Sequence, residues 1–443
     1  MRLSVKDGHM RQRIVKFEIS TDKTQGIILD SLTYAAGKLW NVANYERKCW
    51  TNDDDTKYPD WYDQKKRLKD HYWYKSLPSQ TSQELLKQLH ESWQSFYKLV
   101  KTNGIKNPQP PRYKNTGTTI RFLNHGFNII DGIIRLAISK GQKEYLTQKH
   151  GITAKFLYIP IPNEYISFKG NPKIIEIIPL GKEKYRVNMI VELPKAEYRI
   201  DKEVYMAIDL GVNNLITCHT STGKSIIISG RQLLSTNRYF DKEIGYYQSI
   251  AYAQQHAWGI QHPKRTKRIE QLYEKRGLQV EHLLHAATKK AVDFAVSEGV
   301  SRIVIGDIAH IRENKDMGRI NNQKFHKWPF GKIKQLIAYK AEDQAIQTEM
   351  QEESFTSQCS PYAAEVSERY AQKNNRRDRG LYVTDGKVFN ADCVGAYNIL
   401  RKYLCRTGKT SPAVVGLDIP MMYRWNSNKG FVSNQKLVIS MAM

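Results

Sequence analysis

The sequence has few cysteines, and none of them form a close pair. Five cysteines stand at positions 49, 218, 359, 393 and 405 of the 443-residue chain. A disulfide-stapled secreted domain needs an even set of cysteines at suitable spacings, and this set does not supply one. A reducing cytoplasm is therefore the predicted location.

Long apolar runs are also missing. No stretch approaches the roughly 20 apolar residues of a membrane-spanning helix, and no signal-type segment opens the chain. We therefore expect no association with membranes. At 443 residues the chain is long enough for two or three domains with real cores.

Acidic residues are scarce beside basic ones. The chain has 44 aspartates and glutamates against 69 lysines and arginines, a formal net charge of +25. This excess is spread over the whole chain, which is typical of proteins that bind a polyphosphate partner. The 26 tyrosines and 8 tryptophans add stacking faces for bases, although many of them must belong to cores. The composition predicts nucleic acid as the partner.

The first informative stretch runs from Val204 to Gly230. An apolar segment, 204–208, ends at Asp209, and the chain then doubles back through Gly211 and Gly223. This pattern predicts a β-meander whose first strand is covered on both faces. An acid at the end of a covered strand needs a cation or a donor, although a lone aspartate in such a place more often caps a turn.

Two later stretches repeat this arrangement. SRIVIGDIAHIREN, 301–314, is a second apolar strand that ends near Asp307, and in KVFNADCVGAYNILRKYL, 387–404, Asp392 opens an amphipathic helix. Strand, meander, strand and helix with acids at their ends suit an α/β fold with an RNase H-like sheet. In such a sheet carboxylates converge to hold divalent metal ions.

The same stretches carry a resemblance to a known family. AIDLGVNNLIT, IVIGDIAHIREN, the segment 321–342, FTSQ at 355–358 and NADCVGAYNIL at 390–400 resemble, in order, the successive RuvC signatures of TnpB, the transposon-encoded RNA-guided nuclease. The miniature type V CRISPR effectors are similar. The resemblance runs from about residue 107 to 405.

The resemblance implies an activity and its partners. It implies an RNA-guided DNA endonuclease that binds a structured guide RNA, acts on double-stranded target DNA with a short flanking motif, and uses Mg²⁺ or Mn²⁺. It also implies a prokaryotic, nucleoid-associated protein, and it names no protein partner.

The resemblance further implies a division into domains. We expect a wedge β-barrel built from a first strand (1–20) and a later segment (116–200), with a helical recognition lobe (21–115) between them. The first part of the RuvC-like nuclease domain (201–354) follows, and then an insert (355–389), the last RuvC-like motif (390–405) and a C-terminal tail (406–443).

Three basic groups are candidates for nucleic-acid binding. The proline-rich loop NPQPPRYK presents the first, a run between two helices holds the second, and the insert holds the third. Charge runs are more often solvated faces, but the positive balance of this chain favours phosphate contact. The residues are Arg112, Tyr113 and Lys114; Lys264, Arg265, Lys267 and Arg268; and Arg376, Arg377 and Arg379.

The insert departs from the family pattern. TnpB proteins usually carry a zinc ribbon built from two CxxC pairs between FTSQ and the last acidic motif, whereas this chain has Cys359 alone there and no histidine. Tetrahedral zinc requires four nitrogen or sulfur ligands. We therefore predict a degenerate, zinc-free insert.

The third metal ligand is the open question. Asp209 and Asp392 match the family directly, but Gly306 stands where most TnpB proteins have glutamate. Asp307 follows it, and strand alternation aims its side chain at the other face. Our first choice of replacement is Glu353, next to Glu352 on the strand that leads into FTSQ, so the predicted metal ligands are Asp209, Glu353 and Asp392. Asp307 acting through a bent strand and an inactive centre stay open.

These alternatives leave two rival functions. A nuclease-inactive, RNA-guided DNA-binding protein would repress transcription without cutting. A structure-selective nuclease would cut without any guide.

Overall fold

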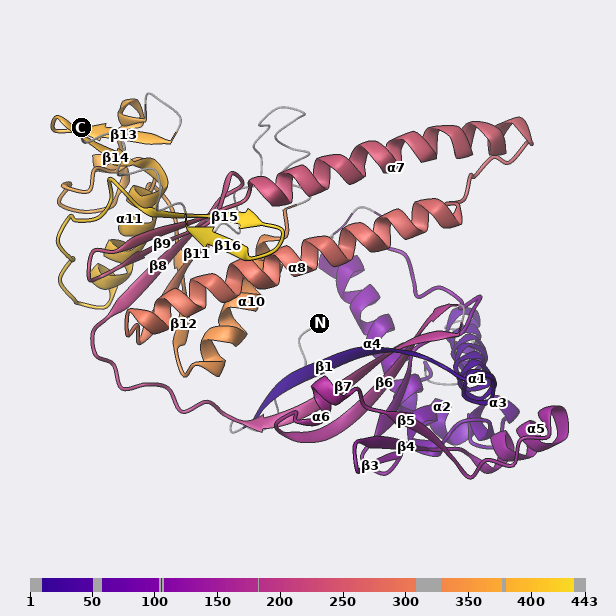
Figure 1. Cartoon of the computed structure of the whole chain (residues 1–443). Coiled ribbons are helices and arrows are strands. Elements are labelled where there is room, and N and C mark those ends of the chain that lie inside the picture. Colours follow the sequence, from indigo (N-terminus) through magenta and orange to yellow (C-terminus); the bar gives the residue numbers. More distant parts are fainter. Residues whose placement is uncertain are drawn as a thin grey trace. The chain divides into compact units, whose positions relative to one another are not determined.

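The structure is a computed structural model that describes residues 10–50, 58–102, 105, 107–181, 183–307, 328–376 and 380–433, without the side chain of residue 373. The chain folds into two compact units, Met1–Lys195 and Ala196–Met443 (Figure 1). The boundary lies close to residue 200, where the sequence predicts that the wedge ends.

The first unit combines two antiparallel sheets with a group of helices. One sheet has the strand order β1-β7-β6-β2, and the other has the order β3-β4-β5. Its elements are β1 (Met10–Ser20), α1 (Lys23–Cys49), α2 (Trp61–Leu68), α3 (Tyr72–Lys75), α4 (Ser79–Thr102), β2 (Ile120–Leu123), β3 (Phe127–Ile130), β4 (Ile133–Ala137), α5 (Lys140–His150), β5 (Phe156–Pro160), α6 (Asn163–Ile166), β6 (Asn171–Gly181) and β7 (Lys184–Pro194). The first strand pairs with β7, and closure into a wedge barrel stays a prediction.

Helix α1 begins at a capping residue, Asp22. The Asp22 side chain accepts a hydrogen bond from the backbone N–H of Gln25, and the Gln25 side chain accepts one from the Asp22 N–H, which is a capping box. The α1 helix packs against α4, where the Trp93 indole donates to Asn44 at 2.9 Å. The apolar spacing in α4 therefore builds a core, as its periodicity indicates.

The second unit is built on one seven-stranded sheet with the order β12-β11-β8-β9-β10-β15-β16. Strands β8 to β10 form an antiparallel meander, while β11 runs parallel to β8 and β12 runs parallel to β11. The strands are β8 (Tyr205–Leu210), β9 (Asn214–Thr220), β10 (Ser225–Ser229), β11 (Arg302–Asp307), β12 (Gln347–Glu352), β15 (Met421–Asn426) and β16 (Gly430–Ser433), with β13 (Leu381–Thr384) and β14 (Lys387–Asn390) in a separate hairpin.

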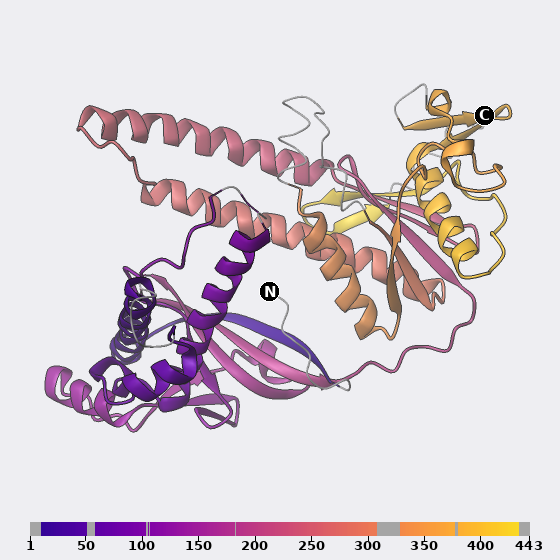
Figure 2. The ribbon, with the colours of Figure 1, turned by 180° about the vertical axis from the view of Figure 1, so that it is seen from behind.

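Helices cover both faces of this sheet. The helices are α7 (Arg231–Ala257), α8 (Lys267–Ser297), α10 (Phe330–Asp343) and α11 (Ala391–Arg406), with 3₁₀ turns at Glu368–Tyr370 and Lys373–Asn375. In both views α11 lies on one face, and α8 and α10 lie on the other (Figure 1, Figure 2). Strand β8 is therefore covered on both sides, as its unbroken apolar run predicts.

The C-terminal segment differs from the predicted tail. Strands β15 and β16 extend the sheet, with Ile226 of β10 opposite Met421 of β15 in parallel register. The prediction was wrong because this strand pairs with one far away in sequence, and local residue preferences do not identify such a partner.

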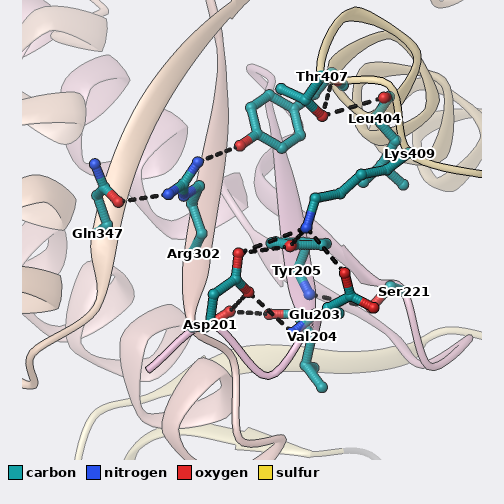
Figure 3. Close-up of polar contacts among 12 residues, drawn as sticks. Asp201, Glu203, Val204, Tyr205, Ser221, Arg302, Gln347, Leu404, Thr407 and Lys409 are labelled. Atoms are coloured by element: carbon teal, nitrogen blue, oxygen red, sulfur yellow. Dashed lines mark hydrogen bonds and ion pairs between the residues drawn. The ribbon is translucent and has the colours of Figure 1, made fainter. Parts of the chain in front are cut away.

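Polar contacts attach the end of α11 to the start of the sheet (Figure 3). The Arg302 guanidinium donates to the Tyr403 hydroxyl at 2.6 Å, and Lys409 contacts Tyr205 and Asp201. Burial opposes ionisation of Asp201, but hydrogen bonds from Tyr205 and other donors lower its pKa to about 2. These contacts fix α11 along β8 and so position the first turn of the helix.

No helix in the parts of the chain that the structure describes is both long enough and apolar enough to cross a membrane.

Candidate active site

Asp209 lies near the end of β8, under the first turns of α11. The two elements approach so closely that a Cβ atom on Gly395 of α11 would lie 2.8 Å from the Oδ2 atom of Asp209. Burial and the nearby charge of Asp392 raise the pKa of Asp209 to about 7, against the opposing effects of Arg376 and of a backbone hydrogen bond at Leu210. The protonated form of Asp209 is therefore favoured more than in an exposed aspartate.

Asp392 lies in the first turn of α11. The Asn390 side chain caps this helix by accepting hydrogen bonds from the backbone N–H groups of Asp392 and Cys393, at 3.1 and 3.2 Å. The Asp392 carboxylate accepts a hydrogen bond from Asn214 at 2.7 Å and lies 3.4 Å from the Arg376 guanidinium. The helix cap and these donors hold the acid at the end of the sheet where Asp209 lies.

Glu353 follows directly after β12 and fills the space left by Gly306. A Cβ atom on residue 306 would lie 2.9 Å from the Cγ atom of Glu353, 2.6 Å from its Cδ atom and closer still to Oε1. The Oε1 atom is buried and has no hydrogen-bond partner among the described residues. The carboxylate of Glu353 thus occupies the place that a side chain at 306 would enter.

The charge environment links Glu353 to the other acids. Burial and then the charge of Asp209 raise the pKa of Glu353 to about 8, and Asp307 and Glu352 add to this rise while Lys334 opposes it. Two neighbouring acids with raised pKa values are typical of functional sites, because ordinary surface carboxylates ionise freely.

Asp307 makes a different contact. Its carboxylate lies 2.6 Å from the ammonium of Lys334 on α10, and the Lys334 side chain is only 13% exposed. In the β11–β12 ladder Asp307 is opposite Glu352, and Gly306 is opposite Gln351. Asp307 is thus paired with a lysine, and its exclusion from the chemistry stays a prediction.

The acids adjoin one another but do not form a closed ligand cage. Within the described ranges no group of three histidine, cysteine, aspartate or glutamate side chains is placed to hold a metal ion as it stands. The residues nevertheless fit a hard divalent cation, since carboxylate oxygens are its preferred ligands and the Glu353 Oε1 atom has no other partner among the described residues. A cation would also offset the burial and the mutual repulsion that together raise the two pKa values.

The structure places the predicted phosphate-binding residues in separate regions. In the first unit the loop after α4 lies against α1, where Lys114 lies 4.7 Å from the Trp40 ring and Lys48 lies 4.3 Å from the Tyr113 ring. The carbonyl of Arg112 accepts a hydrogen bond from the Trp40 indole at 3.1 Å. This loop therefore packs on α1, while Arg112, Tyr113 and Lys114 stay exposed.

The second basic group lies at the end of a helical hairpin. Helices α7 and α8 run side by side away from the sheet, and their connection carries Lys264 and Arg265, with Lys267 and Arg268 opening α8 (Figure 1). Arg265 and Arg268 lie over the rings of Tyr273 and Tyr247, at 4.3 and 5.2 Å.

In the third group only Arg376 is among the described residues. Arg376 reaches Asp392, as described above, while Arg377 and Arg379 lie outside the described residues.

Two functional candidates were missed in the sequence. Asn214 holds Asp392, and Lys334 holds Asp307. Asn214 stands inside the motif AIDLGVNNLIT, where a polar residue after a covered strand was a usable signal. No sequence signal pointed to Lys334, because only the packing of α10 places it at the end of β11.

The second unit thus has an α/β fold with acidic side chains gathered at one end of its sheet. Two family models match the chain: OrfB_IS605, a probable transposase, over residues 188–312, and the Cas12f1-like TNB domain over residues 330–399. Over these residues the chain is therefore similar to TnpB-like proteins and to the miniature type V CRISPR effectors.

Two curated proteins are similar to this chain. The TnpB-like protein ORF457 of Acidianus two-tailed virus is 24% identical over 408 residues, covering 84% of this chain and 83% of the relative. The CRISPR-associated endodeoxyribonuclease Cas12f1 of Sulfoacidibacillus thermotolerans is 27% identical over 182 residues, 40% of this chain and 42% of the relative.

Among solved structures, the chain resembles the Cas12f1 protein of a Cas12f1–sgRNA–target DNA complex determined by cryo-EM. The TM-score is 0.56 at 15% identity, covering 86% of this chain and 83% of that one. At this identity the similarity shows a shared fold.

Proposed function

We propose that this protein is an RNA-guided DNA endonuclease whose second unit is an RNase H-like, RuvC-type nuclease domain. The proposal is supported by the strand order of the sheet, in which a three-stranded meander is followed by two parallel strands beside its first strand. It is also supported by Asp209 and Asp392, which stand on the first strand and on the late helix of that layout.

The observation that carries the proposal is the fit between Gly306 and Glu353. Most TnpB proteins place a glutamate at the position of Gly306. Here the space beside residue 306 holds a carboxylate from the neighbouring strand instead, in contact with the position where a Cβ atom would be. The acid has moved in sequence while a carboxylate remains at the same end of the sheet.

Asp209, Glu353 and Asp392 would hold Mg²⁺ or Mn²⁺. When bound, such an ion stabilises negative charge on the attacking and leaving oxygens of a phosphodiester. Asp209 and Glu353 would release the protons that their raised pKa values retain. Asn214 would keep Asp392 oriented through its 2.7 Å hydrogen bond.

The partners follow from the relatives and from the charge. One relative is a CRISPR-associated endodeoxyribonuclease, and one similar structure holds an sgRNA and target DNA. By analogy, this protein binds a guide RNA that selects double-stranded target DNA by base pairing, while the protein reads backbone shape and a short flanking motif. The net charge of +25 suits these partners.

A second candidate is guided DNA binding without cleavage. It is favoured by the glycine at position 306 and by the lack of a ready three-ligand cluster among the described side chains. Such a protein would repress transcription by occupying its target.

The deciding experiment uses purified protein with its native RNA, a matched DNA target and Mg²⁺. Asp209→Ala, Asp392→Ala and Glu353→Gln should each abolish cleavage and leave guided binding intact, because binding depends on phosphate contacts and base pairing elsewhere. Each loss should exceed the roughly 10- to 100-fold cost of removing an outer-sphere partner.

Two matched controls separate the acids. Glu352→Gln changes the adjacent acid, which pairs with Lys402, and should leave cleavage intact. Asp307→Asn should keep most of the activity. If Asp307→Asn is inactive and Glu353→Gln is active, the proposal that Glu353 replaces an acid at position 306 is overturned. If the unmodified complex does not cleave, the binding-only repressor is the better account.

A further inference from the structure

A cavity of about 740 Å³ lies in the insert that follows β12. Four of its lining residues carry side-chain amides, and one carries an aromatic ring: Gln358, Gln372, Asn374, Asn375 and Phe355. Among the described side chains that line it there is no lysine or arginine. In a protein with 25 excess positive charges, such a surface is poorly suited to a phosphate and well suited to a base.

Two residues that line the cavity are close neighbours, in the chain, of candidate-site residues. Phe355 follows Glu353 by two residues, and Asn375 directly precedes Arg376. The Arg376 guanidinium lies 3.4 Å from the Asp392 carboxylate. A nucleotide held at the acids by its phosphate therefore has its base within reach of this wall.

The backbone holds the amides in place and leaves their side chains available. The Gln358 carbonyl accepts hydrogen bonds from the Gln372 N–H at 3.0 Å and from the Tyr382 hydroxyl at 2.9 Å. Within the described part of the chain, the side-chain amides of Gln358 and Asn374 make no hydrogen bond. They are free to donate to, and accept from, a ligand.

A second amide pair is already oriented. The Asn375 amide nitrogen donates to the Gln372 side-chain oxygen at 2.9 Å and to the Tyr382 hydroxyl at 3.2 Å. These bonds leave the Asn375 oxygen as an acceptor and the Gln372 nitrogen as a donor. A donor and an acceptor side by side are the groups with which amides read one edge of a base.

Phe355 is held in a backbone conformation that bulky residues rarely adopt. Its φ angle is +64°, and the turn around it is closed by hydrogen bonds from the Thr356 N–H to Glu353 and from the Cys359 N–H to Phe355, at 3.2 and 3.0 Å. Strained residues of this kind gather at functional sites. The ring supplies a face on which a base can stack.

We propose that this amide cavity binds the unpaired base of a nucleotide beside the phosphodiester to be cut, and that it favours adenine. Asparagine and glutamine side chains pair bidentately with adenine, accepting from its N6 amino group and donating to a ring nitrogen. The inference rests on the proposed nuclease function, and it adds a local base preference that base pairing with a guide does not provide.

The test uses guide-loaded protein and matched targets that differ only in the bases around the mapped cut positions, as runs of dA or dT. Cleavage beside dA should be faster by about 5- to 150-fold, the range of one bidentate amide–base pair. Gln358→Met and Asn374→Leu should remove this preference while the rate on dT is retained. Asn428→Leu, in the exposed turn between β15 and β16, is the control and should keep the preference.

A second measurement does not depend on cleavage. Short single-stranded dA and dT oligonucleotides compete for the guide-loaded protein in EDTA, and dA should bind more tightly in the unmodified protein and in Asn428→Leu only. Equal affinities, or a preference that survives both cavity variants, would overturn the proposal. Cleavage without base preference would overturn the base-binding proposal and leave the nuclease function standing. Loss of all cleavage with a retained preference for binding dA would support the base-binding cavity and overturn the nuclease function.

Discussion

At the scale of single residues, the geometry of the candidate site depends on a glycine, which has no side chain. Gly306 has no Cβ atom, and the Glu353 carboxyl group lies in the space that this atom would take. A strand glycine of this kind often marks a close approach by another group. Here the approaching group is an acid with a raised pKa.

Gly306→Ala should therefore reduce cleavage much as Glu353→Gln does, by about 10²-fold or more if Glu353 is a metal ligand. The new methyl group must displace the carboxyl group, since it would lie 2.6 Å from the Cδ atom of Glu353. A side-chain end can swing aside at little cost, so the melting temperature should change little. Cleavage rates and thermal unfolding of the same preparation measure the two effects.

Gly331→Ala is the matched control, because a Cβ atom at this helix position meets nothing within 4 Å. It should leave cleavage unchanged and raise stability by about 0.5–1 kcal/mol. A fully active Gly306→Ala would show that Glu353 need not lie where it does.

The raised pKa values predict how activity and stability depend on pH. Asp209 and Glu353, with pKa values near 7 and 8, must both lose protons to hold a cation. Cleavage should therefore increase by up to about a hundredfold per pH unit below pH 7 and by up to about tenfold between pH 7 and 8, and it should level off above pH 8. Loss of rate on raising the pH from 6 to 8 would contradict these ionisations.

Stability of the metal-free protein should show the opposite trend. Above about pH 4.5 the unfolded chain releases the Glu353 proton while the folded chain keeps it, so folding loses stability until the pH passes about 8. Glu353→Gln should reduce this decline in melting temperature between pH 5 and 8. An identical decline in Glu352→Gln and Glu353→Gln would assign it to other groups.

At the scale of elements, the insert after β12 is attached to α11 by hydrogen bonds. The Asn398 side-chain amide donates to the carbonyls of Thr356 and Cys359, both at 2.8 Å, and Arg401 donates to the carbonyl of Ser360 at 3.3 Å. The thiol of Cys359 is directed to the Ser367 carbonyl at 3.2 Å. If the insert is free of zinc, as the sequence predicts, these contacts are what joins it to α11.

We therefore predict that zinc chelation leaves the melting temperature unchanged, while Asn398→Ala destabilises the second unit by about 1–3 kcal/mol, because it leaves two buried carbonyls without donors. Asn428→Ala, at an exposed turn, should be neutral. Denaturation with and without 1,10-phenanthroline, together with elemental analysis, measures both effects. About one zinc per chain would show that ligands come from elsewhere.

At the scale of the whole molecule, the net charge of +25 governs binding. RNA-free protein should bind DNA of any sequence, with an affinity that falls steeply as salt rises, because bound phosphates release their counterions. Lys264→Ala combined with Lys267→Ala should lower the slope of log affinity against log salt by about 2. Titrations of fluorescent DNA at several salt concentrations measure the slope.

Gln254→Ala, on the exposed surface of α7, is the control and should leave the slope unchanged. Sequence-directed binding by strictly RNA-free protein at moderate salt would contradict a guided mechanism.

The sequence alone determined the features that local pattern controls. The apolar run before Asp209, the turn glycines and the helix start at Asp392 predict elements that the structure contains. The order of the acidic motifs was enough to indicate the resemblance to TnpB, because each motif is a contiguous stretch. Excess positive charge is a sum over residues and needs no structure at all.

The tertiary structure decided what depends on contacts between distant residues. The position of Glu353 beside Gly306 follows from the parallel register of β12 on β11 and from the turn at Phe355, which no local pattern specifies. The partners Asn214 and Lys334, and the strand that 421–426 adds to the sheet, likewise come from packing between segments far apart in the chain. Pairing between distant strands is set by the fit of whole faces, and that fit exists only once the sheet has formed.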